Sequence, residues 1–109
     1  METTNFFEDA KNIAKLIPTG RVCSYGAIAK YLGAARSARM VGWALNSSKP
    51  EEQIPAHRVV NRKGLLTGKK HFDGPNQMQV LLEAEGIKVI ENQIQNLDQI
   101  WWDPNEELL

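Results

Sequence analysis

Cysteine is nearly absent from this chain of 109 residues, in which Cys23 is the only one. A lone cysteine excludes an internal disulfide, and with two histidines it forms no spacing typical of zinc ligands. The sequence also lacks an apolar run long enough to span a membrane, and its first residues do not have the pattern of a signal peptide. We therefore expect a cytoplasmic protein with no metal, no cofactor and no disulfide.

The chain is also short. Its length suits one domain over residues 1–109 and leaves no room for a separate catalytic domain. Hydrophobic residues make up 42% and charged residues 24%, which is typical of globular proteins rather than disordered or fibrous ones. Any function must therefore be carried by the core domain itself.

Net charge is zero only as a sum over the whole chain. Residues 10–72 carry twelve basic and two acidic side chains, a net charge of +10, whereas the two flanks carry eleven acids and one lysine. This segment suggests a polyanion as partner, because each neutralised phosphate releases counterions. A solvated surface that folding spreads out would explain the asymmetry equally well. The twelve basic residues are Lys11, Lys15, Arg21, Lys30, Arg36, Arg39, Lys49, Arg58, Arg62, Lys63, Lys69 and Lys70.

The first half of the chain has the periodicity of helices. Apolar residues at positions 6, 10, 13 and 17 predict a first helix that ends before Gly20. Ser24 is a suitable N-cap for a second helix over 25–32, and Gly33 ends it. A third helix is predicted from about Arg36 to Leu45. Two helices around a glycine-containing turn indicate a helix-turn-helix over about 25–46.

One face of the third predicted helix is polar and basic. Spacings of three and four residues place it away from the apolar stripe and make it the face that a recognition helix presents to DNA. Its members are Arg36, Arg39, Trp43 and Ser47. For Trp43 two interpretations stay open, contact with the sugars of DNA and packing against a neighbouring loop.

The second half of the chain is predicted to contribute strands. Residues 58–72 alternate around two glycines and predict a hairpin or wing that carries Lys69 and Lys70. A helix follows Pro75 and ends at Gly86, a strand covers 87–90, and the tryptophans at 101 and 102 pack on the core. The predicted fold class is a small α/β, mostly helical, winged helix-turn-helix.

Four motifs occur in the order seen in the O6-alkylguanine-DNA alkyltransferases. They are Tyr25-Gly26 with Ile28-Ala29, then Ser37-Ala38-Arg39-Met40-Val41-Gly42, then Ile54-Pro55-Ala56-His57-Arg58-Val59-Val60, and finally Glu85-Gly86. The chain resembles the DNA-binding domain of these enzymes over roughly residues 6–104. The resemblance implies docking in the minor groove of duplex DNA and flipping of an O6-alkylguanine nucleotide into a pocket.

The resemblance also implies roles for single residues. Arg39 matches the arginine that enters the base stack in place of the flipped nucleotide, and Tyr25 matches the tyrosine that pushes on the adjacent phosphate. The alternative interpretations are a nonspecific phosphate contact for Arg39 and a buried aromatic for Tyr25. By the same resemblance, the lesion pocket consists of Tyr25, Ala56, Arg58 and Lys69.

The segment 54–60 resembles the active-site loop of the family, with Ala56 in the position of the nucleophilic cysteine. A methyl group has no lone pair and cannot accept an alkyl group. His57 and Glu85 match the helpers of the cysteine, and without it we expect them, like Arg58, to brace the loop. Cys23 is expected to be a buried structural residue rather than a replacement acceptor.

This departure resembles the alkyltransferase-like branch of the family. The resemblance implies a monomer that binds O6-alkylguanine in DNA without repairing it and hands the site to nucleotide excision repair proteins. Two alternatives stay open: an active methyltransferase with another acceptor, and a helix-turn-helix transcription regulator that reads an operator. In the wing, Lys69 and Lys70 contact either the lesion or, in the interpretation we favour, DNA phosphates.

Overall fold

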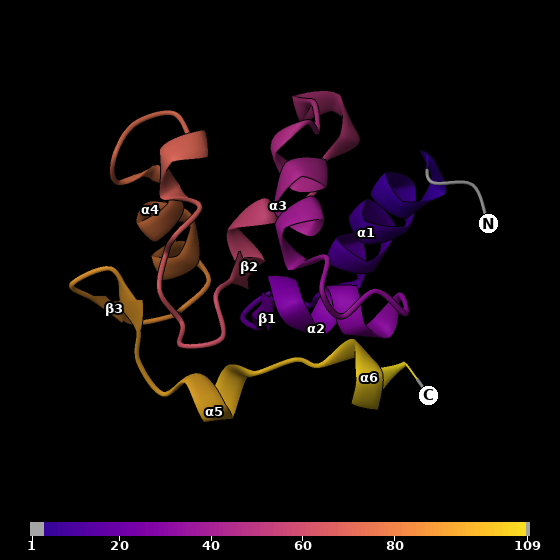
Figure 1. Cartoon of the computed structure of the whole chain (residues 1–109). Coiled ribbons are helices and arrows are strands. Elements are labelled where there is room, and N and C mark those ends of the chain that lie inside the picture. Colours follow the sequence, from indigo (N-terminus) through magenta and orange to yellow (C-terminus); the bar gives the residue numbers. More distant parts are fainter. Residues whose placement is uncertain (1–3, 109) are drawn as a thin grey trace.

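The computed structural model describes residues 4–108, and these form a mainly helical protein with two small sheets (Figure 1). The longer helices are α1 (Thr4–Leu16), α2 (Tyr25–Tyr31), α3 (Ala38–Asn46) and α4 (Gln77–Ala84), and short helices are α5 (Leu97–Ile100) and α6 (Pro104–Glu107). The strands are β1 (Cys23–Ser24), β2 (Val59–Val60), β3 (Val89–Ile90) and β4 (Gln93–Ile94). Single 3₁₀ turns are η1 (Pro50–Glu52), η2 (Ala56–Arg58) and η3 (Lys69–His71). Within residues 4–108, no helix is long and apolar enough to cross a membrane.

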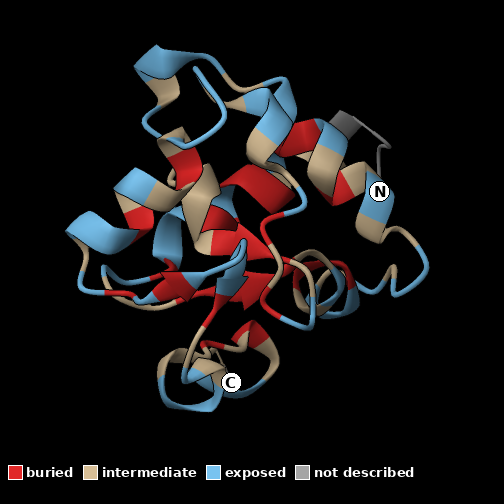
Figure 2. Ribbon diagram, turned by 90° about the vertical axis from the view of Figure 1, so that its left-hand side faces the viewer, coloured by how far each residue is buried: buried red, intermediate tan, exposed pale blue. Residues whose placement is uncertain are grey.

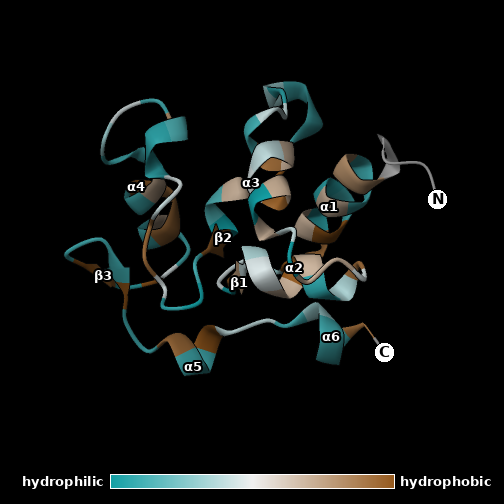
Figure 3. Ribbon diagram, in the orientation of Figure 1, coloured by the Kyte–Doolittle hydropathy of each residue, from teal (hydrophilic) through white to brown (hydrophobic). Residues whose placement is uncertain are grey.

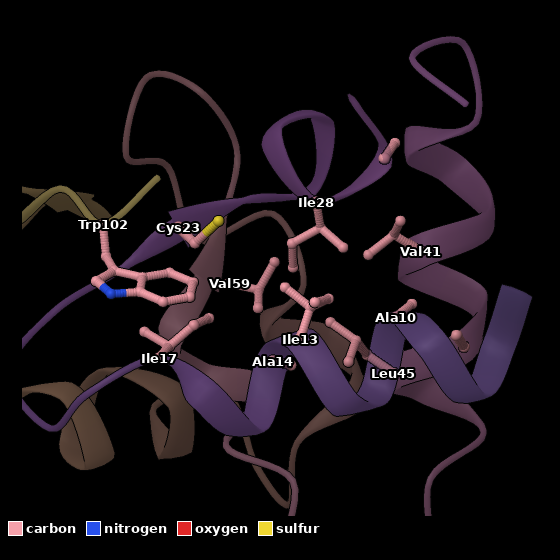
Figure 4. Packing of buried hydrophobic residues seen from close by; sticks show 12 residues of the cluster. Ala10, Ile13, Ala14, Ile17, Cys23, Ile28, Val41, Leu45, Val59 and Trp102 are labelled. Carbon is pink, nitrogen blue, oxygen red and sulfur yellow. The ribbon is translucent and has the colours of Figure 1, made fainter. Parts of the chain in front are cut away.

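The first helix packs one apolar face onto α2 and α3. Its inward residues Ala10, Ile13 and Ala14 are buried, as is Ile17 directly after the helix, in agreement with the predicted periodicity. Figure 4 shows them meeting Ile28, Val41 and Leu45 of the next two helices. Burial of these aliphatic side chains fixes the position of α3 on the molecule.

The predicted helix-turn-helix is confirmed. The Ser24 hydroxyl accepts a hydrogen bond from the backbone N–H of Ala27 at 3.0 Å and so caps α2. Gly33 ends the helix with φ +77°, a left-handed conformation that favours glycine. The turn then leads into α3, which packs closely on α2.

The third helix begins later than the sequence suggested. The backbone N–H of Ser37 donates to the Ala34 carbonyl at 2.8 Å, so this part of the chain is still a turn, and α3 starts at Ala38. The prediction that Arg36 belongs to the helix was therefore wrong. At the other end Ser47 is the C-cap residue, and its hydroxyl donates to the Ala44 carbonyl at 2.8 Å.

Two strands from distant parts of the chain pair at the centre of the molecule. β1 and β2 are parallel, with Cys23 opposite Val59 and Ser24 opposite Val60. Successive strand residues face opposite sides, so Val59 joins the core of α1 to α3, whereas Val60 joins a second core with α4. This pairing places the loop before β2 beside the helix-turn-helix. Figure 2 shows the buried strands near the centre of the molecule.

The prediction of a hairpin over 58–72 was wrong. Val59 and Val60 are both fully buried and pair with β1, which leaves no second strand within this segment. The Asn61 side chain instead accepts hydrogen bonds from the N–H groups of Lys63 and Leu65 and closes a turn, and η3 follows. The antiparallel hairpin of the fold is β3–β4, connected through two residues with positive φ.

The last third of the chain covers the second core. α4 buries Met78 and Leu82 and, as predicted, ends before Gly86, which has φ +85°. Trp102 is buried and donates its backbone N–H to the Val22 carbonyl at 2.7 Å, so the tail lies beside the strand that precedes α2. The segments around η1 and η3 are hydrophilic by contrast (Figure 3).

Candidate nucleic-acid interface

An open cavity of about 350 Å³ lies between the exposed side of α3 and the loop before η3. Tyr25 lines it from the start of α2, and Thr67, Gly68 and His71 line it from the loop. From α3 it receives Ala38, Arg39, Gly42, Trp43 and Asn46. The cavity therefore joins the helix-turn-helix to a segment far from it in sequence.

Tyr25 occupies the junction between these two walls. Its ring lies about 3.9 Å from the position that a Cβ atom on Gly42 would take, and its hydroxyl lies under Gly68. A Cβ atom on Gly68 would be only 2.6 Å from that hydroxyl, so the loop can approach Tyr25 only with glycine here. Burial raises the pKa of the Tyr25 hydroxyl, and a hydrogen bond with the Thr67 side chain opposes that shift.

Arg39 and Trp43 stand one helical turn apart on the outer face of α3. Both are exposed and both line the cavity. Arg39 is long, planar and cationic, which suits insertion between bases from a minor groove. This is the part of the predicted recognition face that the fold preserves.

A second cavity of about 430 Å³ adjoins the first. Ala56 lines it together with Ile54, and its far side is formed by residues of α4 and the segment after η3. Asn46 and His71 line both cavities, so the two are neighbours. The structure thus places Tyr25 and Ala56 in adjoining cavities rather than in one pocket.

The residues after Ala56 belong to a hydrogen-bonded network centred on Glu85. Nε2 of His57 lies 2.6 Å from one carboxylate oxygen, and the Arg58 Nε–H donates to both carboxylate oxygens at 3.0 and 3.1 Å. The backbone N–H of Gly20 donates to the same carboxylate at 2.7 Å. Arg58 further donates to the Ile17 carbonyl at 2.8 Å, so the network ties the loop to the end of α1.

These donors favour the ionised form of the Glu85 carboxyl group. Burial raises the pKa of the Glu85 carboxyl, but hydrogen bonds from Arg58, from the Gly20 N–H and from His57 outweigh it and lower the pKa to about 2. Side-chain exposure is only 10% for Glu85 and 17% for Arg58, so this is a largely buried ion pair. The expectation that His57, Arg58 and Glu85 brace the loop agrees with this arrangement.

The structure separates other residues of the predicted site. Arg58 lines neither of the two cavities in the described part of the chain, because its guanidinium is bound to Glu85, Ile17 and Thr19. Lys69 and Lys70 line a third hollow of about 300 Å³, next to Pro75. Lys70 is exposed, as are Arg36 in the turn and Ser47 at the helix end, although the Ser47 hydroxyl already donates to the Ala44 carbonyl.

The loop contributes three cavity residues to which the sequence analysis assigned no role. Thr67, Gly68 and His71 face Tyr25 and α3, whereas the prediction for this loop rested on its two lysines. Gly68 and His71 are three residues apart, and a 3₁₀ turn places residues at that spacing on the same side. Recognition of η3 would therefore have identified His71, but no sequence signal marks Thr67.

Cys23 lies in the hydrophobic core of the molecule. It is fully buried among Ile17, Ile28, Val59 and Trp102 (Figure 4). Burial, followed by the charge of Asp103, raises the pKa of the Cys23 thiol to about 12. The predicted burial of Cys23 is confirmed. Among residues 4–108, no group of His, Cys, Asp or Glu is arranged to hold a metal ion.

Part of the basic segment serves the fold itself. Lys11 pairs with Glu52 at 3.1 Å, and the Arg21 guanidinium donates to the carbonyls of Ile100 and Trp101. Together with Arg58, these residues use their charge inside the protein. The positive charge open to a ligand is therefore smaller than the sequence suggests, and includes Arg39 beside the cavity.

A helix-turn-helix whose second helix exposes Arg39 and Trp43 beside two adjoining cavities defines a small DNA-binding domain. The model of the DNA binding domain of 6-O-methylguanine DNA methyltransferase matches residues 5–87. The chain belongs to this family.

Two relatives and one solved structure show how far the likeness extends. Alkyltransferase-like protein 1 of Schizosaccharomyces pombe is 32% identical over 108 residues, covering 95% of this chain and 100% of that protein. The DNA base-flipping protein of Escherichia coli is 42% identical over 80 residues, covering 71% of this chain and 58% of that protein. The crystal structure of the S. pombe protein in complex with damaged DNA containing O6-carboxymethylguanine is 31% identical and has a TM-score of 0.83, covering 95% of this chain and 100% of that chain.

The extent of these matches differs. The chain spans the full length of the S. pombe relative but less than two thirds of the E. coli relative. The predicted fold class, the DNA-binding domain of the alkyltransferase family, is confirmed by the family match and by the structural match.

Proposed function

We propose that this protein binds O6-alkylguanine in duplex DNA and does not transfer the alkyl group. The proposal rests on one observation about Ala56. This residue lines a cavity and directly precedes His57, and both His57 and Arg58 contact Glu85. By its motif, Ala56 stands where the transferases have their nucleophilic cysteine. The residues that hold the loop in place are present, whereas a sulfur atom that could accept the alkyl group is not.

Binding would use the exposed face of α3 in the minor groove. In this proposal, Arg39 enters the stack in place of the flipped nucleotide, and Tyr25 acts on the adjacent phosphate. Flipping costs a few kcal/mol of stacking and pairing, and a planar cation in the gap offsets part of that cost. Arg36, Ser47, Lys69 and Lys70 would contact the phosphate backbone. The similarity of this chain to a DNA base-flipping protein and to a protein bound to damaged DNA supports this mode.

The alternative of a transferase with a different acceptor finds no support in the site. A methyl side chain has no lone pair with which to displace an alkyl group from oxygen. Cys23 is buried, and its raised pKa of about 12 keeps it a thiol at neutral pH. A transcription regulator is disfavoured because it would not require the adjoining cavities.

The proposal has finer parts. We expect residues 1–109 to act as one domain and as a monomer in the cytoplasm, because the face of α3 is left open for DNA rather than for a second copy. A bound lesion would then be passed to nucleotide excision repair proteins. Sedimentation with and without duplex DNA tests the monomer, and pull-down by lesion-bound protein with purified repair proteins tests the handover.

Two measurements test the main proposal. The first compares the affinities of the protein for matched duplexes with O6-methylguanine or guanine at one position, and a clear preference for the lesion is expected. The second incubates the wild-type protein and Ala56→Cys with DNA radiolabelled on the alkyl group. The wild-type protein should acquire no label, and any label on it would contradict the proposal. Equal affinities in the first measurement would contradict lesion recognition. Labelling of Ala56→Cys would show that the network still supports an acceptor at this position.

A further inference from the structure

Trp43 is an apolar residue whose exposure the fold leaves unexplained. It exposes 54% of its surface, whereas Trp102 is buried in the core. An aromatic ring buries much apolar area when it finds a partner, so a ring in water at a cavity is positioned for contact with a ligand. The other interpretation considered for Trp43, packing against the neighbouring loop, does not fit this exposure.

The position of Trp43 identifies that ligand. Trp43 lies one turn after Arg39, and both line the same cavity, so a nucleotide displaced by Arg39 would leave the duplex beside the indole. His71 lines the same cavity from the loop and also lines the second cavity, together with Ala56. A base that leaves the duplex beside Trp43 would therefore meet His71, which borders both cavities.

We propose that Trp43 stacks on the extruded nucleobase at the mouth of the cavity, with His71 on the opposite wall. The ligand class is a purine base outside the duplex, and this inference rests on the proposed function. Stacking on an aromatic side chain tolerates different bases, because every base has a π face. Trp43 would thus hold the nucleotide outside the stack, and the cavity at Ala56 would accommodate the alkyl group.

Affinities of three variants test the stacking. Trp43→Ala should weaken binding to an O6-methylguanine duplex by roughly tenfold, and Trp43→Phe by less, because one stacked base is lost or reduced. The matched control is Val80→Ala, since Val80 is 53% exposed on α4 and lines none of the cavities described above. It should bind like the wild type. Thermal unfolding should show that all three variants remain folded.

A duplex with an abasic site in place of the lesion separates stacking from contact with the DNA backbone. With no base to stack on, Trp43→Ala and the wild-type protein should bind this duplex equally. An equal loss on both duplexes, or no loss on either, would overturn the proposal. A wild-type protein without lesion preference contradicts the proposed function, whereas a preference that Trp43→Ala leaves unchanged contradicts only the stacking.

Fluorescence gives an independent readout. Trp43 is the exposed tryptophan, so binding of the lesion duplex should quench emission in the wild-type protein but much less in Trp43→Ala. The abasic duplex should cause little quenching in either protein. Equal quenching by the abasic and lesion duplexes would also overturn stacking on the base.

Discussion

Nε2 of His57 lies 2.6 Å from Oε2 of Glu85. The residue directly before His57 is Ala56, whose methyl side chain has no reactive atom. The same carboxylate also accepts hydrogen bonds from Arg58 and from the backbone N–H of Gly20. The support of this loop therefore consists of contacts that also hold α1, η2 and the end of α4 together. Such contacts stabilise the fold whether or not the loop carries a reactive side chain.

Glu85→Gln should destabilise the protein by about 3 kcal/mol, because it leaves the largely buried Arg58 guanidinium without its partner. Urea denaturation measures the free energy of unfolding. The matched control is Glu83→Gln in the same region, which is exposed and should change stability by no more than about 0.5 kcal/mol. Equal effects of the two changes would contradict the bracing role.

Stability should also fall in acid through Glu85. Its folded pKa of about 2 lies below the ordinary value of 4.5, so its contribution is complete above pH 4.5 and is lost as the pH falls towards 2. The depressed pKa corresponds to about 3 kcal/mol. Unfolding free energies measured between pH 2 and 7 should decline less steeply for Glu85→Gln than for the wild type. Parallel curves would exclude Glu85 as the source.

Gly68→Ala should displace Tyr25 and weaken DNA binding. The added Cβ atom would lie 2.6 Å from the Tyr25 hydroxyl, so either the ring or the loop must move. We expect a loss of about 1–3 kcal/mol in stability from this overpacking. Gly26→Ala is the control for stability, because a Cβ atom there meets nothing within 4 Å and alanine favours the helix. A Gly68→Ala protein with wild-type stability and affinity would show that the close approach is unimportant.

Arg39→Ala should reduce affinity for the lesion duplex by roughly 10- to 100-fold, because no side chain then fills the gap left by the flipped nucleotide. Affinity for unmodified DNA should fall far less. Arg36→Ala is the comparison, since Arg36 is an exposed arginine in the turn before α3. It should weaken both duplexes alike and lower the salt dependence of binding. If the two variants behaved alike, Arg39 would contact only phosphate and would not fill the gap left by the flipped nucleotide.

Ala56→Trp should narrow the range of adducts that the protein binds. The indole would occupy part of the cavity of about 430 Å³ that Ala56 lines. We expect affinity for bulky O6-alkyl groups to fall while affinity for O6-methylguanine is retained, because a small group needs little of that volume. Dissociation constants for a series of adducts measure this, and an unchanged ranking would reject the effect of volume.

Much of the fold was accessible from local sequence patterns. The apolar periodicity of α1, the cap at Ser24 and the stop at Gly33 depend on residues within a few positions of one another, and each was predicted correctly. The hairpin over 58–72 was not, because its glycines and apolar residues fit either a hairpin or a buried strand followed by turns. The partner of Val59 and Val60 is β1, more than thirty residues earlier, and only the folded structure reveals this pairing.

The sequence by itself predicted the family, the alanine in the position of the nucleophile and the exposed positions of Arg39 and Trp43, because these follow from residue identity and helical spacing. Only the tertiary structure decided that Arg58 turns towards Glu85, that Lys69 lies outside the two cavities, and that Gly68 and His71 face Tyr25 and α3. The physical reason is that a side chain takes the partner that packing brings near it. For these residues that partner comes from a distant part of the chain.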